Sequence, residues 1–280
     1  MLTRLVQISR PVLWVNTIGT TVIGMWLIGD LWRWDILPLL LWATLPFNLL
    51  IYGVNDIFDQ ETDAQNPRKG GLEGARILGS ETRSIVLGVL LTNVPFIAYF
   101  LFVLPPVALA WIAAYTVIFI FYSAPPLRFK ARRYLDSLSN TAYAFPLVFV
   151  PLALGESPTW AAAIGLMAWS VAKHTYDAVQ DIDEDRAADI HTTAVYLGAR
   201  GATVWSGVWW ALSTVAFALV SWPVAVVNAV IASWLVLSLG RVPPWATARR
   251  LYRYSIVFPY VAGSVAGAQI VASILLGVYR

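Results

Sequence analysis

The chain has 280 residues, of which 59% are hydrophobic and only 12% are charged. A soluble domain carries about 25% charged residues, so this composition excludes an ordinary soluble protein and indicates an integral membrane protein. The formal net charge of +3 is too small for a nucleic-acid footprint, and the absence of cysteine excludes disulfides and thiolate metal sites.

Apolar runs long enough for a helix to cross a bilayer recur along the whole chain, since a crossing takes about 20 residues. They lie near residues 11–29, 36–54, 84–103, 105–123, 137–154, 159–178, 202–220, 223–240 and 254–277. The first run is too long for a signal-peptide core and no convincing cleavage site follows it, so we expect it to be retained. The sequence predicts an all-α, polytopic membrane protein with nine transmembrane helices in a bundle.

The basic side chains give this bundle an orientation. Many of them fall in the three longest stretches outside the runs, residues 55–83, 124–136 and 179–201. Only Arg33 and Arg280 fall on the opposite side, and Lys173 lies inside a run. By the positive-inside rule the N-terminus and these three loops are cytoplasmic, and nine crossings place the C-terminus outside. We expect a multi-pass plasma-membrane protein whose long loops form a cytoplasmic cap.

The second apolar run leads directly into an acidic stretch. Asn55, Asp59 and Asp63 lie four residues apart. On a helix each such step rotates by about 40°, so the three side chains are predicted to share one face. Asp56 lies off that face, and we expect it to orient Asn55 or a basic residue. Carboxylates this close repel one another, so either a cation sits among them or they form a solvated helix end.

A second acidic stretch follows the sixth apolar run. Asp177, Asp181 and Asp185 repeat the four-residue spacing. Magnesium prefers oxygen ligands and is usually held by a few carboxylates together with substrate phosphates. Two such helix ends, four predicted helices apart, favour a magnesium–phosphate site and hint at an internal repeat. A cation transporter or channel is the alternative of another class, but it would need ionisable residues near the bilayer midplane.

Both stretches resemble the paired aspartate motifs of the UbiA superfamily, the intramembrane prenyltransferases. The segments Tyr122–Lys130 and Arg10-Pro11 are also similar to that family, and the resemblance covers nearly the whole chain as one domain, residues 1–280. Asp189 departs from the pattern, because the family often carries glycine there. More narrowly, residues 66–71 and the segment from Lys173 to Thr193 look like the lycopene elongases.

This resemblance implies a transferase that moves a dimethylallyl (C5) unit from its diphosphate to lycopene, giving C45 and then C50 carotenoids. It implies Mg²⁺, with two ions expected, and these metal ligands: Asn55, Asp59, Asp63, Asp177, Asp181 and Asp185. Among them the catalytic set is Asp59, Asp63, Asp181 and Asp185. The expected partners are dimethylallyl diphosphate, lycopene and membrane lipids, with no nucleic acid. A prenyltransferase for an aromatic or quinone-precursor acceptor is the alternative.

Basic and aromatic residues near the motifs complete the predicted site. Two basic pairs are candidates to grip the pyrophosphate, or merely set topology: Arg68 and Lys69, and Arg128 and Lys130. Aromatic faces attract a desolvated cation by roughly 1–2 kcal/mol, which suits a carbocation. The predicted chamber residues, for which core packing is the alternative, are Asn16, Tyr52, Tyr115, Tyr122, Tyr143, Trp169, Lys173 and Tyr176. We expect Lys173 to pair with an aspartate, because an unpaired charge inside a span is costly.

Overall fold

The computed structural model describes residues 2–60, 77–240 and 244–278, and throughout these ranges the only regular structure is helical. The all-α class is therefore confirmed. The chain forms two compact units, the first made of Met1–Arg128 and Phe145–Pro158 and the second of Phe129–Ala144 and Thr159–Arg280. The assignment of one functional domain stays a prediction.

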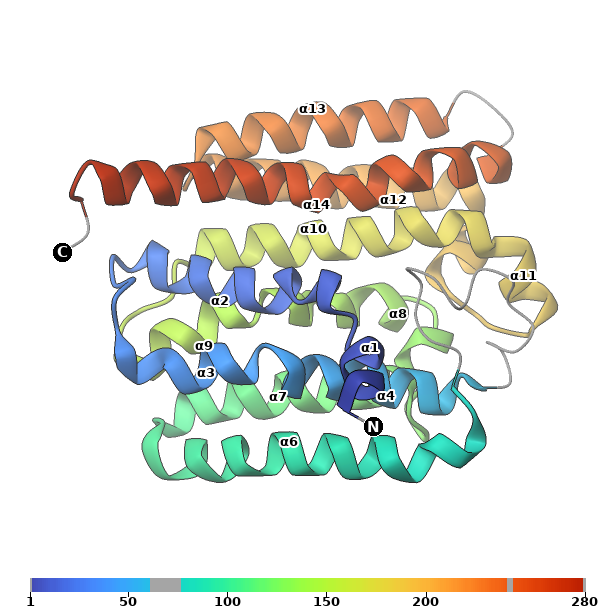
Figure 1. The fold of residues 1–280 in the computed structure, drawn as a ribbon. Helices are drawn as coiled ribbons and strands as arrows, with labels where there is room; N and C mark the ends of the chain where they lie inside the picture. The colour runs from blue at the N-terminus through green and yellow to red at the C-terminus, as the bar shows by residue number, and fades with distance from the viewer. Residues whose placement is uncertain (1, 61–76, 241–243, 279–280) are drawn as a thin grey trace. The chain divides into compact units, whose positions relative to one another are not determined.

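The first unit is a bundle built mainly on one helix that ends in the first acidic motif. Its helices are α1 (Leu2–Ile8), η1 (Pro11–Leu13), α2 (Val15–Leu27), η2 (Trp34–Ile36), α3 (Leu37–Trp42), α4 (Leu45–Phe58), η3 (Gly79–Glu81), α6 (Thr82–Val103), α7 (Pro106–Ser123) and α9 (Pro146–Ala153). Helix α4 packs against α6 and α7, while α9 packs against α2 and α7 (Figure 1). Gly24 allows the close approach of α2 to α9, because a Cβ there would lie only 3.1 Å from the carbonyl oxygen of Pro146.

An aromatic cluster forms the core beneath α4. The Phe47 ring stacks on Tyr115 with centroids 4.3 Å apart, and Trp42 meets Phe47 at 4.4 Å. The Trp42 indole donates to Asn93 Oδ1 at 2.9 Å, which gives its buried N–H a partner. Packing of this kind fixes α4 against α6 and α7, and so fixes the helix end that carries the motif.

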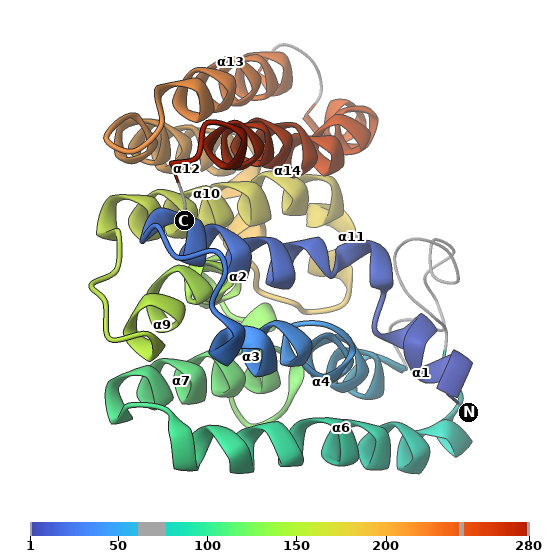
Figure 2. The same cartoon turned by 60° about the vertical axis from the view of Figure 1, so that its left-hand side comes forward.

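The second unit is a bundle of long helices around α10, which leads into the second acidic motif. Its helices are η4 (Phe129–Ala131), α8 (Leu135–Leu138), η5 (Ser139–Ala144), α10 (Trp160–Ala178), η6 (Val179–Asp181), α11 (Ile182–Ala187), α12 (Thr193–Ala218), α13 (Trp222–Leu239) and α14 (Pro244–Leu275). Helix α12 packs against α10 and α13, and α14 packs against α13, so these helices run side by side (Figures 1 and 2). The core contains Tyr176, Trp210, Leu235 and Phe258.

Five described segments are long and apolar enough to cross a membrane. They are Trp34–Phe58, Gly79–Val103, Pro106–Ser123, Trp222–Leu239 and Thr247–Leu275, and they match five of the nine predicted spans. The described segment Pro11–Leu27 is apolar but shorter. Outward-facing apolar side chains such as Phe102, which is 89% exposed, have the environment they need in lipid. The integral membrane class is supported, while the count of nine spans and the cytoplasmic cap stay predictions.

The predicted fifth span, residues 137–154, is not one continuous helix. It comprises the end of α8, then η5 and α9, and the break before α9 coincides with the boundary between the two units. Pro146 lies in the first turn of α9 and lacks the N–H that a continuous helix would need there. Side-chain bonds from Ser139 and Thr141 to carbonyl oxygens three residues earlier accompany the tight turns of η5. The expectation of a regular helix here was wrong.

The orientation of the chain can be tested with reporter fusions. A reporter joined after Arg280 is expected to register as external, and one inserted near Gly74 as cytoplasmic, because seven of the nine predicted spans, an odd number, lie between the two sites. Paired alkaline phosphatase and fluorescent protein fusions measure this. The same location for both sites would contradict the odd number of spans.

Candidate functional site

The first acidic motif lies where α4 ends. Asn55 is in the last turn, and its Nδ2 donates to Ser123 Oγ of α7 at 2.7 Å, which leaves the carbonyl oxygen Oδ1 as the atom that suits a metal ion. Asp59 is the C-terminal capping residue, with φ −105° and ψ 5°, and it is buried. Asp63 lies outside the described residues.

Asp56 forms a buried ion pair beside this motif. Arg10 Nη2 donates to Asp56 Oδ1 at 2.6 Å, and the two side chains are only 14% and 0% exposed. The guanidinium also covers one face of the Tyr52 ring at 4.5 Å from the centroid. Arg10 has φ 52°, a left-handed conformation that is uncommon for a residue with a side chain. The expectation that Asp56 orients a basic residue is therefore met by Arg10, 46 positions earlier in the sequence.

The second motif interrupts its helix at the equivalent position. Helix α10 ends at Ala178, a single 3₁₀ turn covers Val179–Asp181, and α11 begins at Ile182. Asp181 has φ −104° and ψ 3°, nearly the same backbone as Asp59. These values lie in the bridge region, where many active-site residues are found. Asp177, Asp181 and Asp185 therefore lie in α10, η6 and α11 and not on one uninterrupted helix, while the sharing of one face by their side chains stays a prediction. The shared break supports an internal repeat.

Asp177 is neutralised by a neighbour on its own helix. Lys173 Nζ donates to Asp177 Oδ2, so the expected pairing of this lysine with an aspartate is confirmed. Ser255 Oγ of α14 donates to the other oxygen, Oδ1, at 2.5 Å. Asp177 is thus held in one orientation by residues four and 78 positions away.

Asp185 is a crowded and half-buried acid of the second motif. Burial, and after it the neighbouring carboxylate of Asp181, raise its pKa to about 6 in spite of the hydrogen bond from Thr192 Oγ1 at 3.3 Å, which lowers it. Crowding of this kind costs free energy in the ionised form. A divalent cation would offset it.

Asp136 is a buried acid that lies outside both acidic motifs and that the motif spacing did not predict. It is fully buried and accepts hydrogen bonds from the backbone nitrogen of Thr193 at 3.0 Å and from its hydroxyl group. His174 Nε2 lies 3.6 Å from the same carboxylate. Asp136 therefore joins α8, α10 and the start of α12. The sequence signal that could have identified Asp136 is its place as the only acidic residue in the basic stretch 124–136.

The donor set fits magnesium. Carboxylate and carboxamide oxygens are its usual protein ligands, and it often takes only one or two carboxylates together with phosphate and water. Burial and the carboxylate of Asp181 both raise the pKa of Asp185, and a bound cation would oppose both effects. Among the described residues no three Asp, Glu or His side chains gather into a group able to hold a metal ion. A magnesium ion held by these residues would therefore need substrate phosphate to complete its coordination.

The candidate pyrophosphate ligands are only partly described. Arg68 and Lys69 lie outside the described residues. Arg128 is half-buried with φ 41° and ends a segment of the first unit, whereas Lys130 is in η4 of the second. Their role stays a prediction.

The predicted chamber residues of the first unit occupy different environments. Asn16 in α2 and Tyr122 in α7 are half-buried. Tyr52 carries the guanidinium of Arg10 on its ring, and Tyr115 is 1% exposed within the aromatic cluster. Tyr115 has a packing role, and the chamber role of all four stays a prediction.

The predicted chamber residues of the second unit also include both half-buried and fully buried rings. Tyr143 in η5 and Trp169 in α10 are half-buried, and Trp169 meets Phe258 edge to face at 5.3 Å. Tyr176 is 1% exposed, and its hydroxyl donates to the carbonyl oxygen of Leu235 at 3.2 Å. Tyr176 therefore stabilises the contact between α10 and α13, whatever else it does.

Comparison with known proteins identifies the same family as the sequence motifs do. The UbiA prenyltransferase family matches residues 17–275. A lycopene elongase/hydratase from Haloferax volcanii is 36% identical over 265 residues, covering 92% of this chain and 85% of that protein.

Two solved structures share the fold. A UbiA homologue from Aeropyrum pernix K1 has a TM-score of 0.69 at 18% identity and covers 94% of this chain and 98% of its own. A UbiA homologue from Archaeoglobus fulgidus, bound to DMAPP and Mg²⁺, has a TM-score of 0.61 at 17% identity with the same coverage.

Proposed function

The chain belongs to the UbiA prenyltransferase family, and on that premise we propose that it transfers a dimethylallyl unit from its diphosphate to lycopene. The observation that carries the acceptor assignment is the 36% identity to a lycopene elongase/hydratase over 92% of the chain. The two acidic motifs, broken at Asp59 and Asp181 in the same way, support the use of a diphosphate.

The difficult step is the departure of pyrophosphate, because it leaves an allylic cation and a concentrated negative charge. Magnesium, when bound, neutralises that charge as it develops. The residues proposed to hold two ions are Asn55, Asp59, Asp63, Asp177, Asp181 and Asp185. Ser123 orients the amide of Asn55, and Ser255 with Lys173 orients Asp177. Prior orientation of the ligands removes a reorganisation cost from the reaction.

Basic and aromatic groups are proposed to complete the reaction. Arg68, Lys69, Arg128 and Lys130 would bind the pyrophosphate oxygens through charge-assisted hydrogen bonds. Half-buried rings such as Tyr122, Tyr143 and Trp169 would face the cation. The terminal double bond of lycopene then forms the new carbon–carbon bond, and the resulting tertiary cation is quenched by water or by loss of a proton.

The polar groups inside the predicted spans also bear on the acceptor. A phenol or acid headgroup would need a buried partner, because leaving it unpaired is costly. The candidate anchors are Asn16, Asn48 and Lys173. Lys173 is engaged by Asp177, so it offers no free cation to an acid headgroup. The amide nitrogen of the fully buried Asn48 is engaged by Thr17 and two carbonyl oxygens, whereas its Oδ1 has no hydrogen-bond partner among the described residues.

The acceptor can be tested in cells that accumulate lycopene. Expression of the chain with dimethylallyl diphosphate available is expected to convert lycopene to C45 and then C50 carotenoids, because lycopene has two equivalent ends. Liquid chromatography with mass spectrometry of pigment extracts measures both products, and the Asp181→Asn variant serves as the control. Unchanged lycopene together with a newly prenylated quinone precursor would contradict the carotenoid acceptor and leave the transferase class intact.

A further inference from the structure

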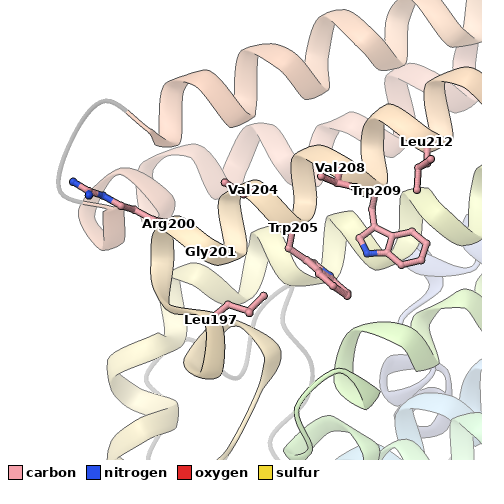
Figure 3. Close-up of a pocket in the computed structure, with 8 residues that line it drawn as sticks. All are labelled: Leu197, Arg200, Gly201, Val204, Trp205, Val208, Trp209 and Leu212. Atoms are coloured by element: carbon pink, nitrogen blue, oxygen red, sulfur yellow. The ribbon is translucent and has the colours of Figure 1, made fainter.

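A groove of about 560 Å³ lies on the surface of α12 in the second unit. Its lining comes from residues 197–212, and all of them are apolar except Arg200. Figure 3 shows Arg200 at one end and Leu212 at the other, with the rings of Trp205 and Trp209 projecting to the same side of the helix. The volume is typical of a ligand site, and none of the predicted metal ligands lines it.

The length of this groove matches one leaflet of a bilayer. Twelve residues separate Arg200 from Leu212, which on a helix corresponds to roughly 18 Å. Half of a hydrocarbon core is about 15 Å. The predicted span 202–220 begins just after Arg200, so the groove runs from the cytoplasmic interface towards the bilayer centre. It suits a single acyl chain and is too short for a carotenoid that spans the membrane.

Basic side chains without acidic partners lie at the interfacial end. Arg200 and Arg133 are exposed, and among the described residues neither forms an ion pair with a carboxylate. The guanidinium of Arg133 covers the Tyr196 ring at 4.8 Å. Tyr134 meets Tyr196 at 5.7 Å and the groove residue Trp205 at 5.5 Å, so the loop carrying Arg133 lies beside the groove.

Two other arginines of this unit are neutralised, since Arg249 pairs with Glu184 and Arg186 pairs with Asp183. What distinguishes Arg133 and Arg200 from the exposed Arg250 of α14 is their place beside the groove, because Arg200 lines it and Arg133 covers the ring of Tyr196, four positions before Arg200 in the sequence. A zwitterionic lipid has no net charge to set against Arg133 and Arg200, whereas an anionic headgroup would neutralise half of their charge.

We propose that this groove binds one anionic phospholipid of the cytoplasmic leaflet. Its phosphate pairs with Arg200 and Arg133, and one acyl chain lies along Val204, Val208 and Leu212. The ligand is neither the prenyl donor nor the acceptor of the proposed reaction. Its binding is measured separately from prenyl transfer, so either hypothesis can fail alone.

The test is a lipid titration of the delipidated, purified protein followed by native mass spectrometry. Phosphatidylglycerol is expected to bind as one molecule about tenfold more tightly than phosphatidylcholine with the same acyl chains. The double variant Arg133→Gln/Arg200→Gln is expected to lose this tenfold preference. Val208→Trp, which fills the groove, is expected to weaken binding of both lipids.

Matched controls distinguish a site from ordinary lipid contact. Arg250→Gln removes an exposed arginine of α14, and Val226→Trp changes a valine of α13 that is 52% exposed, against 53% for Val208. Neither control is expected to change the preference or the affinity. Equal affinity of the wild type for both lipids, or equal losses in test and control variants, would overturn the proposal. Full competition by soluble glycerol phosphate would also overturn it, because the apolar groove would then contribute nothing.

Discussion

Asp59→Asn and Asp181→Asn are each expected to lower prenyl transfer by roughly a thousandfold or more. Each substitution keeps the size of the side chain and removes one negative charge that the proposed magnesium ions require. Both residues end a helix with nearly the same bridge-region backbone, and Asp59 is buried. Purified variants are assayed at saturating Mg²⁺ with radiolabelled dimethylallyl diphosphate. Chelation should likewise stop the wild-type enzyme, and added Mg²⁺ should restore it.

The matched control is Asp183→Asn. Asp183 lies two residues after Asp181, but its side chain is 71% exposed and pairs with Arg186 on the surface. It should therefore retain activity close to that of the wild type. Near-normal activity of Asp59→Asn or Asp181→Asn would contradict the two-metal proposal. Equal loss in Asp183→Asn would indicate a general effect of charge at this helix end.

Breaking the buried ion pair between Arg10 and Asp56 is expected to give the largest change in stability. Arg10→Met leaves the fully buried Asp56 carboxylate without its guanidinium partner. Removing one partner of a buried pair typically costs about 3–5 kcal/mol. The substitution also removes the cation from the Tyr52 ring, and it leaves residue 10 in a left-handed conformation without the contacts that now hold it. Denaturation in detergent, followed by tryptophan fluorescence, measures the loss.

A double-variant cycle isolates the pair. Asp56→Leu alone should also destabilise the protein, and Arg10→Met/Asp56→Leu should recover much of the loss, because no buried charge remains. Arg33→Met breaks the exposed pairs of Arg33 with Asp30 and Asp35, and it should leave stability unchanged. Additive losses in the cycle would show that Arg10 and Asp56 act independently.

The sequence was sufficient for features that follow from hydropathy or from the spacing of residues along one regular helix. Runs of about 20 apolar residues predict helices whatever their neighbours, because in lipid the backbone must satisfy its own hydrogen bonds. Five of these runs match described helices that are long enough to span. The pair between Lys173 and Asp177 was also predictable, because residues four apart are neighbours on a helix. The spacing of the acidic motifs also marked both helix ends.

Local pattern failed where the backbone changes geometry within a motif. The four-residue spacing predicted that each motif lies along one face of a regular helix. The helix is instead interrupted at Asp59 in the first motif and at Asp181 in the second. The run 137–154 has no charged residue, yet it is divided between the two units after Ala144, just before α9 begins at Pro146. Hydropathy reports how apolar a segment is, and it does not report whether tertiary packing keeps that segment in a single helix.

Tertiary structure alone decided which partners orient the site. Asn55 is held by Ser123, Asp177 by Ser255, and Asp56 by Arg10, across 68, 78 and 46 positions of sequence. Asp136 is held by Thr193 across 57 positions. Such pairs depend on which helices pack together and at what rotation, and many rotations bury similar apolar areas. Composition and spacing leave that choice open, and the packed bundle of each unit makes it.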